Sequence, residues 1–394
     1  MTTTWRGPTG RAMRHSLAAW ALGAVVLRVI VVPPERCGPV ERADVWAAAE
    51  SATRWLVRNQ QPDGTFLYRY DADSGEDLDG YNLVRHAGVT MSLYQAAAAG
   101  IDGALESADR GLEHALDLVE TVGDRAALAD DETSWKAGST ALLVVALVER
   151  RELTGETDHD EVLERLGRFL VGQVEPSGAV SARFDPVAGE PVVGSRSIFY
   201  TGEVGWALAR LASELGPEWR DPSDAVGAYL ANDRDDAEGR FPPVSDHWAA
   251  YRLEADAALS GLDDAERAQV DRLGRIFGVQ VRYESQRTGS LLSWATRGRP
   301  TLAAGLGTLG EGLGRLVLAA EREPALADVA EPAAERMTCV TSLLVDRQAG
   351  ADDVGEDASP DAVVGAWFQF GVTQMDDQQH ALSALLVHLE ATAA

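Results

Sequence analysis

The chain of 394 residues is 45% apolar, and its 62 acidic against 35 basic residues give a formal net charge of −27. That charge argues against nucleic acid and anionic membrane surfaces as partners, because like charges repel. A chain of this length and composition can bury one large core without needing two domains. Its two cysteines, Cys37 and Cys339, exclude a disulfide-rich framework and a cysteine metal site.

Residues 1–40 differ from the rest of the chain. Four basic residues precede an apolar stretch from Leu17 to Leu27, which Arg28 interrupts. A basic start before a short apolar stretch is typical of an export signal, whereas a membrane-spanning helix needs about 20 apolar residues. We predict that residues 1–40 form a signal-anchor-like or disordered segment whose deletion leaves a folded domain of residues 41–394. The protein is then membrane-anchored or secreted, and a cytoplasmic protein with an extended start is the alternative.

Twelve segments after residue 40 have apolar residues at helical spacing. They are 44–58, 87–98, 105–118, 137–152, 160–171, 202–213, 224–231, 248–259, 264–279, 302–320, 325–344 and 379–391. Some, such as 137–147, are apolar or small all round, which is typical of buried helices, while others are more polar. Twelve helices in pairs predict an all-α (α/α)6 toroid of six inner and six outer helices. A solenoid of helical repeats is the competing arrangement.

An internal repeat supports this architecture. Residues 54–88 and 168–202 match without a gap at a shift of 114 residues, with 11 identities in 35 positions. The repeated unit reads as the end of a helix, a Pro-x-Gly stop, a short hairpin and the start of a new helix. Repetition of one such unit indicates a fold built by packing copies against each other, with short β-hairpins between helix pairs.

A known motif is similar to the first copy of the repeat. Residues 54–66 resemble the QW repeat of the terpenoid-cyclase-like toroids, in which an aromatic–aliphatic pair leads to a Gln and then to Gly-x-aromatic. Residues 167–180 form a looser second copy. The resemblance implies an (α/α)6 barrel, the fold of triterpene cyclases, six-hairpin glycosidases, sugar epimerases and several polysaccharide lyases. The fold does not choose among these activities.

Polar residues at the starts of the inner helices are the predicted catalytic groups. Three of them stand two residues before a glycine that lets neighbouring helices approach, and Lys136 is the only lysine in the chain. Two histidines at the starts of later inner helices complete the set. The fifth inner helix offers only glycines and leaves one wall without polar groups. The predicted catalytic residues are His86, Lys136, Tyr200, His247 and His380.

Further polar side chains near these positions are predicted to bind substrate. A cavity rich in donors and cations suits an anionic or hydroxyl-rich small molecule or oligosaccharide, and titratable groups in it can move protons. These residues predict a carbohydrate-active enzyme of the uronate lyase, epimerase or hydrolase type. No cofactor and no metal are predicted, although scattered histidines leave zinc as an alternative. The predicted substrate-binding residues are Asn82, Arg85, Glu203, Trp248, Arg252, Asp376, Asp377 and Gln379.

Three alternatives stay open at this point. A glycosidase needs two carboxylates about 5–10 Å apart, and with 62 acidic residues such pairs are easily found. A terpenoid-cyclase-like enzyme is suggested by residues 129–134, which are similar to the cyclase acid motif and place Asp131 at the protonating position. A noncatalytic toroid that binds or scaffolds a partner is the third, and a cavity filled by apolar side chains would favour it.

Overall fold

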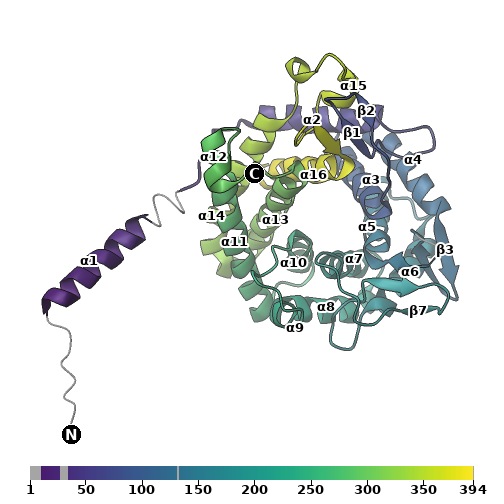
Figure 1. Ribbon diagram of the computed structural model, residues 1–394. Helices are drawn as coiled ribbons and strands as arrows, with labels where there is room; N and C mark the ends of the chain where they lie inside the picture. The colour runs from purple at the N-terminus through teal and green to yellow at the C-terminus, as the bar shows by residue number, and fades with distance from the viewer. Residues whose placement is uncertain (1–9, 27–33, 131–132, 394) are drawn as a thin grey trace, which may run out of the picture.

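Six inner helices form a closed ring in the computed structural model, which describes residues 10–26, 34–130 and 133–393. Each inner helix contacts the next one in sequence, and the last contacts the first, as Figure 1 shows in a view down the ring. These helices are α3 (Leu83–Ala98), α5 (Ala137–Thr154), α7 (Tyr200–Glu214), α10 (His247–Leu259), α13 (Ala303–Arg322) and α16 (Met375–Ala391).

Six outer helices surround this ring. Each contacts the inner helices that precede and follow it in the chain, and the first outer helix also contacts the last inner one. The outer helices are α2 (Arg42–Arg58), α4 (Ala104–Asp117), α6 (Asp160–Gln173), α8 (Arg220–Asn232), α11 (Asp264–Glu284) and α14 (Ala327–Arg347). All twelve predicted helices are present, and the all-α (α/α)6 toroid is confirmed.

The pattern of apolar residues explains which helices lie inside. In α5 every residue from Ala137 to Val148 is buried, because inner helices are covered on all sides. In the outer helix α4 only one stripe is buried, at the i, i+3, i+4 spacing of a helix with one face in water. Short helices and turns fill the connections: α9 (Arg234–Ala237), α12 (Leu291–Arg297), α15 (Pro360–Val363), η2 (Pro217–Trp219), η3 (Pro324–Leu326) and η4 (Ala351–Asp353).

Three small antiparallel sheets stand between the helix pairs. The first has the order β2-β1-β8, the second pairs β3 with β4, and the third has the order β5-β6-β7. The strands are β1 (Arg69–Asp71), β2 (Glu76–Asp77), β3 (Val119–Val122), β4 (Arg125–Leu128), β5 (Trp135–Lys136), β6 (Arg183–Asp185), β7 (Glu190–Pro191) and β8 (Val372–Gln374). Strands β5 and β8 lead directly into the inner helices α5 and α16.

Both copies of the sequence repeat adopt the same local hydrogen bonding. Asp71 pairs with Glu76 in the first hairpin, and Asp185 pairs with Glu190 in the second, at the same shift of 114 residues. In each copy the Asp Oδ1 accepts from the backbone N–H groups two and three residues later. The identical aspartates and glycines of the repeat therefore build one turn twice.

The N-terminal segment has two parts in the described residues. Helix α1 (Gly10–Val26) is exposed at every residue from Met13 to Val26. No helix among the described residues has both the length and the apolar character needed to cross a bilayer, so the predicted anchor finds no support. The apolar stretch continues into residues 27–33, which lie outside the described part of the chain.

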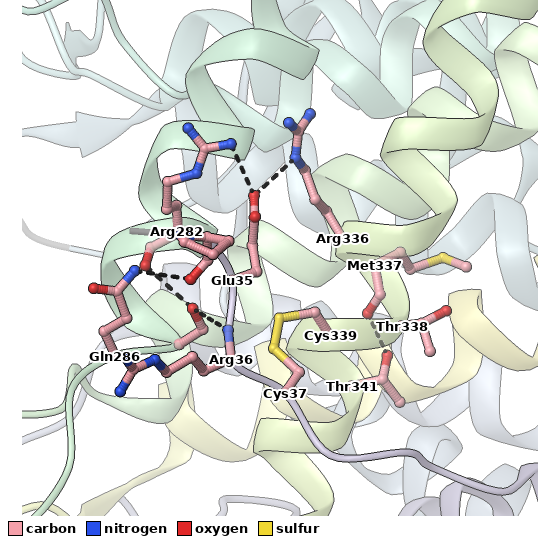
Figure 2. The surroundings of a disulfide bond; sticks show 12 residues. Glu35, Arg36, Cys37, Arg282, Gln286, Arg336, Met337, Thr338, Cys339 and Thr341 are labelled. Atoms are coloured by element: carbon pink, nitrogen blue, oxygen red, sulfur yellow. Dashed lines mark hydrogen bonds and ion pairs between the residues drawn. A yellow bond between two sulfur atoms is a disulfide. The ribbon is translucent and has the colours of Figure 1, made fainter. Parts of the chain in front are cut away.

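Residues 34–40, in contrast, lie against the toroid (Figure 2). Cys37 forms a disulfide with Cys339 of α14, with the two Cα atoms 5.2 Å apart. One Glu35 oxygen is 3.4 Å from Arg282 of α11 and 3.5 Å from Arg336 of α14. Burial opposes ionisation of Glu35, but a backbone hydrogen bond and the two guanidinium groups lower its pKa overall. We call residues 34–40 the clasp, because they connect the start of the domain to the outer helices α11 and α14.

Truncation tests whether the clasp stabilises the toroid. We expect deletion of residues 1–33 to leave the melting temperature unchanged, since the clasp remains. Deletion of residues 1–40 should leave a folded domain that is less stable, because a disulfide closing a long loop typically contributes about 2–4 kcal/mol. The Cys37→Ser variant is the matched control that loses only the disulfide. Equal melting temperatures for both truncations, measured by circular dichroism under non-reducing conditions, would contradict this role.

Candidate active site

A cavity of about 380 Å³ opens where the inner helices begin. All six inner helices or the residues that precede them contribute to its wall, so the ring itself forms the site. Polar caps hold these helix starts in place. The Asn82 side chain accepts from the first turn of α3, and the Asp246 side chain accepts from the Ala249 N–H of α10. Asp377 of α16 accepts from the Ala304 N–H and so caps the neighbouring helix α13.

Two buried histidines lie together in this cavity. His247 is the first residue of α10, and His380 lies in the second turn of α16. Their ring centroids are 5.1 Å apart and the planes are nearly perpendicular, at 81°. Phe199 and Trp248 pack against the His247 ring at 5.9 and 4.4 Å. Trp248 also lies 5.8 Å from the His380 ring, so aromatic side chains pack against both imidazoles.

A buried carboxylate, that of Glu311, contacts both histidines. It lies on α13 and is fully buried. Its Oε2 is 2.7 Å from His380 Nδ1 and 3.9 Å from His247 Nε2. Its Oε1 accepts a hydrogen bond of 3.0 Å from the Tyr251 hydroxyl. Sequence reasoning missed this residue, although Glu311 is the only acidic residue in the apolar, glycine-rich run 302–320.

The surroundings give the two histidines opposite proton affinities. Burial alone would lower the pKa of His380, but the adjacent Glu311 carboxylate raises it to about 9. Burial, together with the positive charge of His380, lowers the pKa of His247 well below its usual value. At neutral pH, His380 therefore carries a proton that it can donate, while His247 is a free base.

A carboxyl group on α7 completes the polar part of the wall. Burial raises the pKa of Glu203 to about 8, with further contributions from Asp246 and Asp376, so this group is protonated at neutral pH. Asp376 lies 3.5 Å from Arg85 Nε and 3.8 Å from His380 Nε2. The site thus holds one neutral acid, one carboxylate paired with arginine, and the two histidines.

Glycines at one register position allow the inner helices to approach, as predicted. A Cβ atom at Gly138 would lie 2.3 Å from Glu203 Oε2, and one at Gly202 would lie 2.7 Å from Asp246 Oδ1. At Gly88 it would lie 3.0 Å from Gln379 Oε1. Each glycine therefore makes room for a polar side chain of a neighbouring inner helix or of its N-cap, and substitution by alanine would displace that side chain.

Most of the predicted site residues line this one cavity. The residues are Asn82, Arg85, Tyr200, Glu203, His247, Trp248, Asp376, Gln379 and His380. The fifth wall carries Ala304, Gly305 and Thr308 of α13, and Glu311 of the same helix is buried next to the two histidines.

His86 lies outside the cavity, between α3 and the outer helix α4. Its Nδ1 accepts from the Tyr81 hydroxyl at 2.7 Å, and its Nε2 donates to the Gly111 carbonyl at 2.8 Å. Burial lowers its pKa to about 4, so the ring is neutral. The Asn82 cap starts α3 three residues before His86, whereas the equivalent Tyr200 is the first residue of α7. His86 therefore lies within the first turns of α3, where its ring bonds to α4, whereas Tyr200 stands at the start of its helix.

Lys136, Arg252 and Asp377 are also absent from the cavity wall. The half-exposed Lys136 is paired with Asp130, with Nζ and Oδ2 2.5 Å apart. Arg252 is buried on the outer side of α10, 2.8 Å from Asp256 and 3.1 Å from Glu266.

The Asp377 side chain accepts a hydrogen bond from the Ala304 N–H at the start of α13 and so caps that helix. Asp131 of the cyclase-like motif lies outside the described residues.

His247, Glu311 and His380 could together hold a divalent cation. Their ligand atoms lie within 4.8 Å of one another, and both nitrogens of His247 lack a hydrogen-bond partner among the described residues. Two histidines and a glutamate are a common zinc-ligand set. The ion would have to displace the proton that His380 shares with Glu311, because metal ligands bind in their deprotonated form.

Solved structures share this fold. The cellobiose 2-epimerase from Spirochaeta thermophila is 13% identical with a TM-score of 0.61, over 89% of this chain and 96% of the epimerase. An inactive α-1,6-mannanase variant from Salegentibacter sp., in complex with α-1,6-mannotriose, is 11% identical with a TM-score of 0.59, over 89% and 100%. A type II terpene cyclase from Scytonema is 12% identical with a TM-score of 0.51, over 89% and 97%.

At these identities the likeness shows the fold alone. No protein-family model and no curated protein matches the sequence. The (α/α)6 toroid implied by the QW-like repeat is thereby confirmed, and the function must be argued from the cavity.

Replacement of Glu311 tests the charge arrangement. In the Glu311→Gln variant we expect the His380 pKa to fall from about 9 to below the ordinary histidine value of about 6.5, because burial then acts without the carboxylate. Nitrogen NMR of histidine-labelled protein measures this directly. Glu164→Gln, which removes a carboxylate paired with Arg168 on the outer helix α6, should leave the His380 titration unchanged. An unshifted His380 in the Glu311 variant would show that another group holds its proton.

The same groups predict how stability depends on pH. His380 and Glu203 have raised folded-state pKa values of about 9 and 8, so both bind protons more tightly in the folded protein. The stability that they contribute is complete below their unfolded pKa values and is lost as the pH rises through the folded ones. We expect the free energy of unfolding to fall between pH 6.5 and 9, by urea denaturation. Glu152, whose pKa burial raises to about 7, contributes only to the first part of this fall.

Glu203→Gln is the matched variant for this pH dependence, because its amide cannot ionise. Its unfolding free energy should decline less steeply than that of the wild type over the same window. Identical slopes would mean that Glu203 is already ionised at neutral pH.

Proposed function

We propose that this protein is a carbohydrate-active enzyme that moves a proton between neighbouring carbons of a sugar, as an aldose isomerase or 2-epimerase. The observation that carries the proposal is the pair His247 and His380, one a free base and the other a proton donor, side by side in one cavity. A base and an acid with separated pKa values are what this reaction needs.

The chemistry follows from the two roles. His247 removes the proton from C2 of the open-chain sugar, and the electron pair forms the C1–C2 double bond of an enediol. His380 donates its proton to the carbonyl oxygen O1, which becomes a hydroxyl. Return of a proton to C1, with transfer of the O2 proton to the now neutral His380, gives the ketose. Return of a proton to the other face of C2, with transfer of the O1 proton back to His380, gives the epimer. With ring centroids 5.1 Å apart, each imidazole can contact one of two neighbouring atoms.

Other cavity residues supply the contacts that a sugar needs. Asn82, Arg85 and Gln379 offer donors, and Asp376 offers an acceptor for hydroxyl groups. Burial raises the pKa of Tyr200, so its hydroxyl stays neutral and can donate. Of the predicted catalytic residues we assign proton transfer to His247 and His380, and binding to Tyr200. The shared fold of a cellobiose 2-epimerase is consistent with this assignment.

A glycosidase is the second candidate, supported by one observation. Glu203 is a buried carboxyl group that is protonated at neutral pH, which is the state of the general acid in glycoside hydrolysis. Asp376 would then be the partner carboxylate. This mechanism would release a new reducing end and would leave the hydrogen on C2 in place, so the two candidates give different products.

The disulfide supports an extracytoplasmic location as part of the proposal. Cys37 and Cys339 are paired, and disulfides persist in oxidising compartments but are rare in a reducing cytosol. A secreted or surface-attached enzyme meets sugars released from polymers.

Deuterium exchange tests the proposed reaction. The full-length protein is incubated in heavy water with a panel of reducing sugars and disaccharides, and proton NMR follows loss of the C2–H signal and formation of epimer or ketose. We expect His247→Asn and His380→Asn each to reduce exchange by at least about 100-fold, since a general acid or base typically contributes 100- to 10,000-fold. A chelator arm shows whether a bound metal is required.

His388→Asn is the matched control, because His388 lies on α16 like His380 but is not part of the cavity wall. It should exchange at the wild-type rate. Release of reducing ends without C2 exchange would favour the glycosidase, and neither reaction on any sugar of the panel would refute the proposed isomerase.

A further inference from the structure

A second hollow of about 640 Å³ lies beside the cavity, between α12 and the turn that precedes β8. The chain continues from α12 through residues 298–302 into α13, and from the turn through β8 into α16, and the starts of both inner helices line the cavity. The two spaces are adjacent. Thr301 lines the second hollow and Gly305 lines the cavity. A Cβ atom added to Gly305 would lie 2.9 Å from Thr301 Oγ1, so the two residues are in close contact. We call this second hollow the arginine groove.

The groove is basic in a strongly acidic protein. Three arginines line it, Arg287, Arg299 and Arg347, and none of its described lining residues is acidic. Arg287 and Arg347 share one carboxylate behind the wall, Glu284, at 2.9 and 3.0 Å. Two guanidinium groups that share one carboxylate have a net charge of about +1. A chain with a net charge of −27 repels anions in general, so an anion that binds here needs this local excess.

Arg299 is the residue best placed to bind an anion. Its Cζ lies 4.6 Å from the Trp294 ring centroid and 4.2 Å from that of Phe370. No carboxylate in the described part of the chain forms an ion pair with it. Stacking on aromatic faces holds a guanidinium in place and leaves the N–H groups in its plane free. A planar fork of fixed donors matches the two oxygens of a carboxylate or sulfate.

The backbone holds one of these rings in an unusual position. Phe370 has a φ of 57° and Gly371 a φ of 77°, and they form a two-residue turn closed by hydrogen bonds between Gln369 and Val372. Such turns favour Asn, Asp or Gly, and a bulky residue with positive φ is strained. Gln369 also ties the turn to the Pro300 carbonyl at 2.6 Å. This costly turn places Phe370, which is 61% exposed, against Arg299.

We propose that the arginine groove binds an anionic group on the sugar unit next to the one that reacts, so that the substrate is an acidic oligosaccharide. The inference rests on the proposed function for the position of the reacting unit in the cavity. The ligand chemistry is an oxyanion, carried either by a uronate carboxylate or by a sulfate ester, bound by Arg299 and flanked by Trp294 and Phe370.

Titration calorimetry with matched disaccharides tests the groove. Cellobiouronic acid is compared with neutral cellobiose, and 3′-sulfated lactose with lactose, on the full-length protein at low salt. We expect at least one acidic sugar to bind about 10- to 100-fold more tightly than its neutral match, the range of a charge-assisted hydrogen-bonded pair. Which pair shows the preference distinguishes carboxylate from sulfate.

Variants of Arg299 identify the residue responsible. Arg299→Gln should abolish the preference without changing the affinity for the neutral sugar, and Arg299→Lys should restore it only in part, because an ammonium group lacks the planar fork. Arg275→Gln, which removes an exposed arginine paired with Asp271 on α11, is the control and should retain the preference. Circular dichroism verifies that each variant is folded.

Two results would overturn the proposal. One is equal affinity for both members of both pairs, including no binding of any of the four sugars, and the other is a preference that survives in Arg299→Gln. The proposed function fails separately: an Arg299-dependent preference in a protein that exchanges no C2 hydrogen would keep the groove and refute the isomerase.

Discussion

Burial of one carboxylate, that of Glu311, organises the centre of this toroid. A charged group without water is strongly destabilising unless it is paired and hydrogen-bonded. Glu311 meets that requirement through His380, which stays protonated beside it, and through the Tyr251 hydroxyl. His247 stays neutral because it is buried and because a second imidazolium 5.1 Å from the first would be repelled. The acid of the proposed reaction therefore follows from the carboxylate on α13, and the base follows from burial together with the charge of that acid.

The ring geometry places the groups around Glu311 at the cavity. Six helices that begin at one mouth place their first turns around a common space, and small residues at a shared register let those turns approach closely. The absence of a side chain at Gly138 and Gly202 leaves room for the side chains of Glu203 and Asp246 between the helices. The hairpins and short helices between the pairs then vary from one position to the next. The arginine groove arises from two such connections, and this is how a repeated scaffold acquires a site without internal symmetry.

Sequence alone predicts the scaffold well and the site in part, for physical reasons. Helical periodicity and the gap-free repeat determine the twelve helices, because both are local signals. The register argument succeeds for Tyr200, which is the first residue of α7, and fails for His86, which lies inside α3 and is hydrogen-bonded to Tyr81 and to the Gly111 carbonyl of α4. Glu311 has a visible signal as a lone acid in an apolar run, but its partners come from other helices. The Cys37–Cys339 pair, separated by 302 residues, depends on ring closure, which no local pattern encodes.

The clasp has a mechanical consequence. With the disulfide formed, residues 37–339 make a covalently closed loop that encloses five of the six inner helices. Tension applied to the two ends of the oxidised chain can extend only the residues outside that loop. Of the inner helices, α16 alone lies outside it, and α16 supplies His380 and Asp376. Under pulling, therefore, the proposed proton donor would leave first while most of the ring stays intact, and reduction of one bond would make the remainder of the barrel extensible.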